Sequence, residues 1–232
     1  MSVWRVKCHP PRAACEVTRQ RIAIVDYGMG NLHSAAKAIE AVSPDSEVLV
    51  TADAAIIDSA ERVVFPGVGA IRDCMAELNH LKLADVVSRA AAEKPLLAIC
   101  IGMQAMMSFS DENGGTQCLG LLPGRVRHFA TDEVDEVGGK LKVPHMGWNQ
   151  VHQTIEHPLW QGIAQDTRFY FVHSYFVAVE EQALVAGSCD YGVQFAAALS
   201  RDNVFAVQFH PEKSHTAGLA LLRNFSSWDG QN

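Results

Sequence analysis

Three short apolar runs in the first hundred residues constrain the fold more than any other feature of the chain. They lie at 22–26, 62–65 and 96–99, and each leads into a turn containing glycine or cysteine and then a helix-like stretch. Continuous apolar runs of this length are typical of strands buried on both faces. Strand and helix in alternation predict an α/β fold with an open, mostly parallel central sheet flanked by helices. We expect helices at 32–42, where Asn31 is a candidate N-cap, and at 70–92 in two pieces, with a further strand at 47–50.

The second half of the chain changes character. Helix signals are sparse until 214–227, and short β-like runs predominate, which predicts a smaller antiparallel portion, either at an edge of the main sheet or as a second layer. We find no internal repeat or linker, so residues 21–232 are predicted to form a single domain. Residues 1–20, with two adjacent prolines, are expected to be a poorly ordered extension. The β-like runs are 125–129, 148–152, 168–172, 195–200 and 204–209.

Composition excludes several classes of protein. The formal net charge of −7 argues against a broad nucleic-acid surface. No stretch has the length and apolarity of a membrane span, and the first twenty residues have no apolar run of signal-peptide length. Six cysteines form no Cys-x-x-Cys pair, which predicts reduced thiols in a cytoplasmic protein.

Cys100 stands where a buried strand meets a helix. Ala98 and Gly102, two residues to either side, give the small–any–nucleophile–any–small pattern of a nucleophile elbow. Such a turn lifts the side chain out of the carboxyl edge of the sheet, where open α/β sheets bind ligands. The positive end of the following helix favours the thiolate. The alternative is that Cys100 is a small buried apolar residue, as most cysteines are.

His210 and Glu212 supply what a cysteine nucleophile needs. A base takes the thiol proton, and a third group orients the base. His210 follows the run 204–209, and Pro211 places Glu212 where its carboxylate can accept from one imidazole nitrogen. The alternative is a loop histidine beside a solvated glutamate. The glycine turn at 67–69 could add backbone N–H groups to that of Ile101 to form an oxyanion hole, or be an ordinary turn.

These motifs resemble a known family. Cys100-Ile101-Gly102-Met103-Gln104 together with Phe209-His210-Pro211-Glu212 resembles the class I (triad) glutamine amidotransferases. The motifs at 26–32, 144–149 and 211–214 resemble one branch of it, the glutaminase subunits of imidazole glycerol phosphate synthases, over about residues 21–228. The family usually has glycine where this chain has Ala98, and it usually begins near Arg21.

The resemblance implies a reaction and a partner. Cys100 would hydrolyse glutamine to glutamate and ammonia through a thioester, with His210 as base and Glu212 as its orienting group. The ammonia would pass to a cyclase with a (β/α)₈ barrel, which makes imidazole glycerol phosphate and aminoimidazole carboxamide ribotide in histidine biosynthesis. The resemblance also assigns substrate binding to Gln104, Glu112, His173, Ser174 and Tyr175; the oxyanion hole to Gly67, Val68, Gly69 and Ile101; and the cyclase-facing surface to Asn31, Trp148 and Lys213.

Several alternatives are weaker. Another triad glutaminase, for anthranilate, purine or pyridoxal phosphate synthesis, lacks the motifs at 26–32 and 144–149. The intact triad argues against a silent, partner-binding relative, and Gln104 argues against a cysteine hydrolase of another substrate. Gly28-x-Gly30 has His33 where a dinucleotide site needs glycine. His145, His173 and His215 share no metal-ligand spacing. We therefore expect neither cofactor nor metal. A peptide flip at 67–69 on activation is a further hypothesis.

Overall fold

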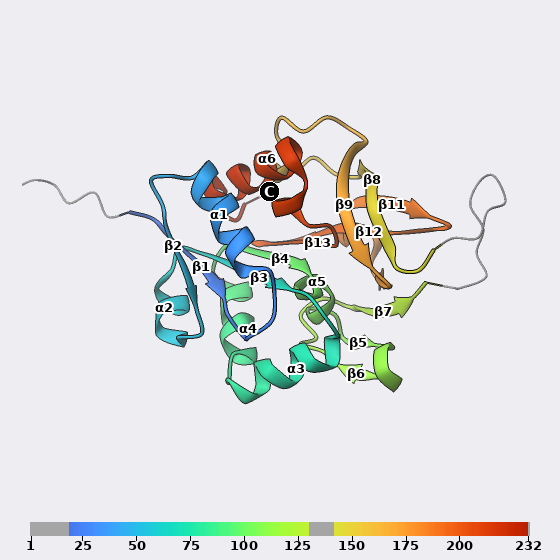
Figure 1. Ribbon diagram of the computed structural model, residues 1–232, viewed down its shortest axis with the longest axis horizontal. Coiled ribbons are helices and arrows are strands. Elements are labelled where there is room, and N and C mark those ends of the chain that lie inside the picture. Colours follow the sequence, from blue (N-terminus) through green and yellow to red (C-terminus); the bar gives the residue numbers. More distant parts are fainter. Residues whose placement is uncertain (1–18, 130–141, 232) are drawn as a thin grey trace, which may run out of the picture.

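A computed structural model describes residues 19–129 and 142–231 (Figure 1). Most of the predicted extension, residues 1–18, lies outside the described residues. Within the described residues, the main sheet has nine strands in the order β2-β1-β3-β4-β13-β12-β11-β8-β9. Five of them, from β2 to β13, are parallel. Their bounds are β1 Arg21–Val25, β2 Glu47–Thr51, β3 Arg62–Gly67, β4 Leu96–Cys100 and β13 Val204–Val207.

Helices cover both faces of the parallel part, as its apolar strands predict. Figure 1 shows α1 and α6 together on one face and α2, α3 and α4 on the other. The helical stretch predicted at 70–92 is indeed two helices, α3 and α4. The helices are α1 Leu32–Val42, α2 Ala54–Ser59, α3 Ile71–His80, α4 Ala84–Glu93, α5 Ile101–Ala105 and α6 His215–Ser227.

The antiparallel portion takes both of the forms that the sequence left open. Four antiparallel strands extend the main sheet beyond β13. A second sheet of four strands in the described residues has the order β10-β7-β5-β6, in which β5 and β7 are parallel and the other two pairs are antiparallel. The predicted α/β architecture is confirmed. The extending strands are β12 Val193–Arg201, β11 Val185–Tyr191, β8 His145–Gln153 and β9 Thr167–His173; the second sheet has β10 Tyr175–Val179, β7 Gly124–His128, β5 Phe109–Ser110 and β6 Thr116–Gln117. Short 3₁₀ helices are η1 Glu112–Gly114, η2 Pro158–Trp160, η3 Gln182–Leu184 and η4 Pro211–Lys213.

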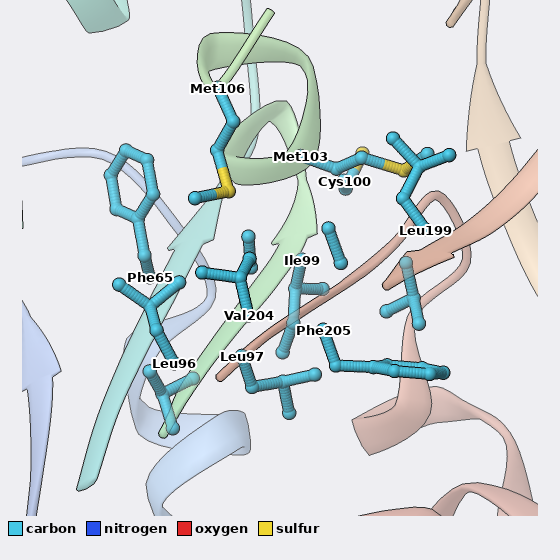
Figure 2. Packing of buried hydrophobic residues seen from close by; sticks show 14 of the residues in the cluster. Phe65, Leu96, Leu97, Ile99, Cys100, Met103, Met106, Leu199, Val204 and Phe205 are labelled. Atoms are coloured by element: carbon cyan, nitrogen blue, oxygen red, sulfur yellow. The ribbon is translucent and has the colours of Figure 1, made fainter. Parts of the chain in front are cut away.

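The core lies around the strand that carries Cys100. Figure 2 shows side chains of β3, β4, β12, β13 and α5 packed together about this strand. Leu96 and Leu97, which point to opposite faces of β4, are both fully buried. Burial of one such side chain contributes about 1.5–3 kcal/mol. The whole of β4 is buried, so this strand is held from both sides and gives Cys100 a rigid base.

Candidate active site

Cys100 has the strained backbone of a nucleophile elbow. It ends β4 and precedes α5 with φ of 55° and ψ of −109°, a conformation that residues other than glycine rarely adopt. Gly102 makes the turn possible, because a Cβ atom there would overlap the carbonyl oxygen of Phe65 on β3. The sharp turn predicted from the sequence is present. The helix that follows it, α5, spans only five residues.

His210 and Glu212 form a buried pair beside this turn. His210 Nδ1 lies 2.8 Å from Glu212 Oε1, and the two side chains are 2% and 4% exposed. Burial acts to lower the pKa of His210, but interactions with Cys100 and Glu212 outweigh it, so the pKa is raised above its ordinary value. Because a carboxylate only accepts, Nδ1 carries the hydrogen of the neutral ring. His210 Nε2 has no hydrogen-bond partner among the described residues, which leaves it available to the Cys100 thiol.

The backbone of His210 is anchored to β9. Its N–H donates to the Tyr170 carbonyl oxygen at 2.9 Å, so the chain turns away from β13 at Val207 and not, as predicted, after Phe209. The Ser214 hydroxyl donates to the His210 carbonyl oxygen at 2.6 Å and accepts from the Tyr170 N–H at 3.0 Å. Ser214 is a positioning residue that the sequence did not identify, although it ends the motif at 211–214.

A cavity of about 320 Å³ joins most of the predicted site residues, within the range of ligand pockets. Cys100 and His210 face it together. Gly67, Asn31 and Glu212 lie around an adjoining crevice behind His210. The residues lining the cavity are Val68, Gly69, Cys100, Ile101, Gln104, Glu112, Pro144, Val172, His173, Ser174, Tyr175 and His210.

The side-chain amide of Gln104 is held by hydrogen bonds that the sequence did not reveal. Its Nε2 donates to the Tyr175 carbonyl oxygen and to Gln208 Oε1, both at 3.0 Å. Its Oε1 is buried with no hydrogen-bond partner among the described residues. Gln208, fully buried, points its own Nε2 at Cys100 Sγ at 3.7 Å. The predicted substrate-binding role of Gln104 can therefore fall only to its oxygen.

The turn predicted as the oxyanion hole is fixed at its start and its end. The Tyr27 hydroxyl, fully buried, donates to the Pro66 carbonyl oxygen at 2.9 Å, and it leaves no room for a side chain at Gly67. Glu112 Oε2 accepts from the Ile71 N–H at 2.9 Å, where α3 begins. Gly69, between these anchors, has a φ of 95°. The hypothesis of a peptide flip in this turn stays a prediction.

The predicted partner-facing residues lie at the surface near the triad. Trp148, 42% exposed, stacks on His215 with ring centroids 4.9 Å apart. Lys213 is exposed beside Glu212, and Asn31 is half-buried. Asn31 occupies the N-cap position of α1, as predicted, but its side chain makes no capping hydrogen bond to the described helix. Its backbone, with φ of −86° and ψ of 55°, departs from the extended form that a capping side chain needs.

The chain is similar in sequence to a well-defined group of known proteins. Residues 23–227 match the family model of class-I glutamine amidotransferase. Imidazole glycerol phosphate synthase subunit HisH of Pseudomonas putida is 58% identical over 212 residues, which cover 91% of this chain and 99% of that protein. The subunit of the same name from Nitrosococcus oceani is 57% identical, with coverage of 90% and 98%.

Solved structures give the same fold. One crystal structure of a glutamine amidotransferase has a TM-score of 0.65 at 14% identity, covering 88% of this chain and 96% of that one. A glutamine amidotransferase from Thermotoga maritima has a TM-score of 0.59 at 13% identity, with coverage of 90% and 96%. No helix among the described residues has the length and apolarity to cross a membrane. The chain belongs to the class I glutamine amidotransferase family and, within it, to the HisH subunits of imidazole glycerol phosphate synthase.

Proposed function

We propose that this protein hydrolyses glutamine and supplies the ammonia to the cyclase subunit of imidazole glycerol phosphate synthase. The observation that carries the proposal is the buried His210–Glu212 pair at 2.8 Å, which shares a cavity with Cys100 at a strained strand-to-helix turn. This is the arrangement of a nucleophile, its base and an orienting carboxylate. The names of the HisH relatives supply the pathway, histidine biosynthesis.

The first half of the reaction forms a thioester. His210 Nε2 takes the thiol proton, and Cys100 Sγ attacks the side-chain amide carbon of glutamine. Negative charge develops on the amide oxygen, and we assign its stabilisation to backbone N–H groups of Ile101 and of the turn at 67–69. The carbon–nitrogen bond then breaks, and His210 gives its proton to the leaving nitrogen, which departs as ammonia.

The second half regenerates the enzyme. A water molecule gives one proton to His210 and attacks the thioester carbon. The carbon–sulfur bond breaks, glutamate leaves, and the Cys100 sulfur recovers its proton from His210. Glu212 accepts from Nδ1 throughout and stabilises each imidazolium form, as the orienting carboxylate does in other triads.

The predicted substrate contacts fit the polarity of the cavity. Gln104 Oε1 offers an acceptor without a partner among the described residues, and the Glu112 carboxylate lines the cavity where it can face the substrate ammonium group. His173, Ser174 and Tyr175 also line the cavity, and we assign this segment to the substrate carboxylate, with His173 contributing through its backbone because both of its ring nitrogens are engaged. We infer that these groups orient glutamine with its amide at Cys100.

The surface beside the triad fits a partner protein. Met146, which is 62% exposed, and Trp148 are two residues apart on β8, so their side chains lie on the same face of the strand. Exposed aromatic and methionine side chains are enriched at interfaces. We infer that this face, with Asn31 and Lys213, meets the (β/α)₈-barrel cyclase.

The four described cysteines carry free, buried thiols, which supports work in the reducing cytoplasm.

The decisive experiment is a coupled assay of glutamate release and imidazole glycerol phosphate formation. We expect weak hydrolysis by the isolated chain and strong stimulation by the cyclase with its nucleotide ligand. Cys100→Ser should abolish glutamine-dependent synthesis and leave ammonia-dependent synthesis intact. Equal glutamate release with and without the cyclase would contradict the coupling, and glutamine use by the serine variant would contradict the role of Cys100.

A further inference from the structure

Two histidines outside the triad form a buried pair. His145 on β8 and His173 on β9 are paired across the two antiparallel strands, and they are 3% and 6% exposed. His145 Nδ1 lies 2.9 Å from His173 Nε2. His173 was predicted to bind substrate, whereas the mechanism gives His145 no task. A hydrogen bond between two imidazole rings holds one hydrogen, so one ring donates and the other accepts.

The surrounding acceptors determine which ring donates. His173 Nδ1 lies 2.8 Å from the Tyr175 carbonyl oxygen, which only accepts, so Nδ1 carries the hydrogen. His173 Nε2 is then the acceptor, and His145 Nδ1 is the donor. His145 Nε2, left without a hydrogen, faces the Asn149 amide nitrogen at 3.3 Å, which also donates to the Asp190 carbonyl oxygen at 2.7 Å. The direction of every hydrogen bond in the series is therefore fixed.

Charge agrees with this assignment. Burial lowers the pKa of His145 to about 4. Burial also lowers the pKa of His173, to about 3. The hydrogen bond to the Tyr175 carbonyl acts to raise this pKa, whereas electrostatic interactions with His145 and His210 lower it further. Both rings are neutral at neutral pH, as one donor facing one acceptor requires.

The series continues to the nucleophile. The Tyr175 carbonyl oxygen that accepts from His173 also accepts from Gln104 Nε2. The same nitrogen donates to Gln208 Oε1, and this orients Gln208 Nε2 toward Cys100 Sγ. With its nitrogen engaged in this way, Gln104, which lines the cavity, has its buried Oε1 left without a hydrogen-bond partner among the described residues.

Aromatic packing holds the first ring in place. His145 is stacked with Tyr191, ring centroids 3.9 Å apart, and with Phe171, 4.9 Å apart, each at an interplanar angle of 24°. The ring therefore presents Nδ1 to His173 in one orientation. Two further residues of the same strand, Met146 and Trp148, are exposed.

We propose that His145 is a positioning residue of the glutaminase site: its Nδ1–H holds the His173 ring against the Tyr175 carbonyl, and that carbonyl holds the Gln104 and Gln208 amides beside Cys100. The inference rests on the proposed glutaminase function. Without the His145 donor, the buried His173 Nε2 has no partner among the described residues, so the ring can turn and its Nδ1–H can leave the Tyr175 carbonyl. The Tyr175 carbonyl then loses one of the two donors that fix it, and the Gln104 amide that it holds can shift away from the position that binds glutamine.

The test compares two substitutions of His145 in the full chain with its cyclase. His145→Phe keeps a ring for stacking and removes the donor. His145→Asn keeps an amide N–H close to the position of Nδ1. We expect the KM for glutamine to rise about tenfold in the Phe variant, the loss of roughly one hydrogen bond, and to stay within about threefold of wild type in the Asn variant.

The nitrogen chemical shifts of the imidazole rings provide a readout that does not depend on activity. In the wild type we expect both His145 and His173 to carry hydrogen on Nδ1, and in the Phe variant we expect the His173 nitrogen shifts to change as its Nε2 loses the donor. Hydrogen on Nε2 of wild-type His173 would overturn the proposal. So would an unchanged KM in the Phe variant, or equal losses in both variants that follow their melting temperatures. A wild type without glutaminase activity would contradict the proposed function, while the tautomer measurement would still stand.

Discussion

At the residue scale, the catalytic histidine is held by its backbone and by its ring independently. Tyr170 and Ser214 bind the main-chain N–H and carbonyl groups of His210, and Glu212 binds the ring at Nδ1. The two sets of contacts have different physical consequences. The backbone contacts set where Nε2 lies, and the carboxylate sets how strongly it holds a proton.

Glu212→Gln tests the carboxylate. We expect kcat for glutamine hydrolysis to fall about 10²-fold, because a neutral amide stabilises the imidazolium less well. The raised pKa of His210 means that the pair stabilises the fold fully below the unfolded-state pKa of about 6.5, and that this contribution is lost as pH rises through the folded-state pKa. The loss of unfolding free energy in the variant, measured by urea denaturation, should be largest near about pH 6 and shrink at alkaline pH. A loss that grows with pH would contradict the assignment.

Ser214→Ala tests the backbone contacts. The substitution leaves the buried His210 carbonyl and Tyr170 N–H without their shared partner. We expect the free energy of unfolding to fall by about 1–3 kcal/mol and kcat to fall with little change in the KM for glutamine. Ser227→Ala is the matched control, since the hydrogen bonds of that exposed hydroxyl to the described residues all lie within α6. Equal effects of the two substitutions on unfolding would remove Ser214 from this role.

At the element scale, the elbow depends on close contact between two neighbouring strands. β3 and β4 are parallel and paired up to Gly67 and Cys100. The chain after Cys100 turns back over β3 so closely that Gly102 touches the Phe65 backbone. The turn is therefore a property of two elements and not of the cysteine alone.

Gly102→Ala and Ala98→Gly test the two small positions of the elbow. We expect the first to lower the free energy of unfolding by about 3 kcal/mol or more and to abolish glutaminase activity, because the added methyl overlaps the Phe65 carbonyl. The second restores the residue usual in the family. It should cost about 1 kcal/mol, chiefly through backbone entropy, and preserve activity. Thermal denaturation and glutamate release measure both. A stable, active Gly102→Ala variant would show that β3 can move aside.

At the scale of the whole molecule, the nine-stranded sheet joins the proposed partner surface to the strands that carry the nucleophile. The parallel strands carry Cys100, and the antiparallel extension carries Trp148. β8 lies next to β9, whose Tyr170 carbonyl anchors His210. A partner on β8 can therefore act on the triad through rigid, adjacent strands.

Trp148→Ala tests that surface. We expect affinity for the cyclase to fall about 10- to 100-fold, as for a central interface tryptophan, with little change in melting temperature because the side chain is 42% exposed. Val50→Ala is the control, since Val50 is 43% exposed on β2, at the opposite half of the sheet. Calorimetric titration with the cyclase measures both. Equal affinities of the tryptophan variant and the wild type would place the interface elsewhere.

The sequence by itself determined the alternation of strand and helix, the elbow at Cys100 and the pairing of His210 with Glu212. These are local properties: burial on both faces produces continuous apolar runs, and a spacing of two residues lets a carboxylate reach an imidazole. Asn31 is at the N-cap of α1 as the sequence predicts, but its side chain makes no capping hydrogen bond to the described helix because the local backbone does not adopt the conformation that capping needs.

Only the tertiary structure decided the partners that hold the triad. Gln208 and Cys100 are 108 residues apart in the chain, Gln104 and Gln208 are 104 apart, and His145 meets His173 only through the register of β8 and β9. A side-chain hydrogen bond needs its two atoms placed to within a few tenths of an ångström. Residue type and spacing do not carry that information; strand order and register do.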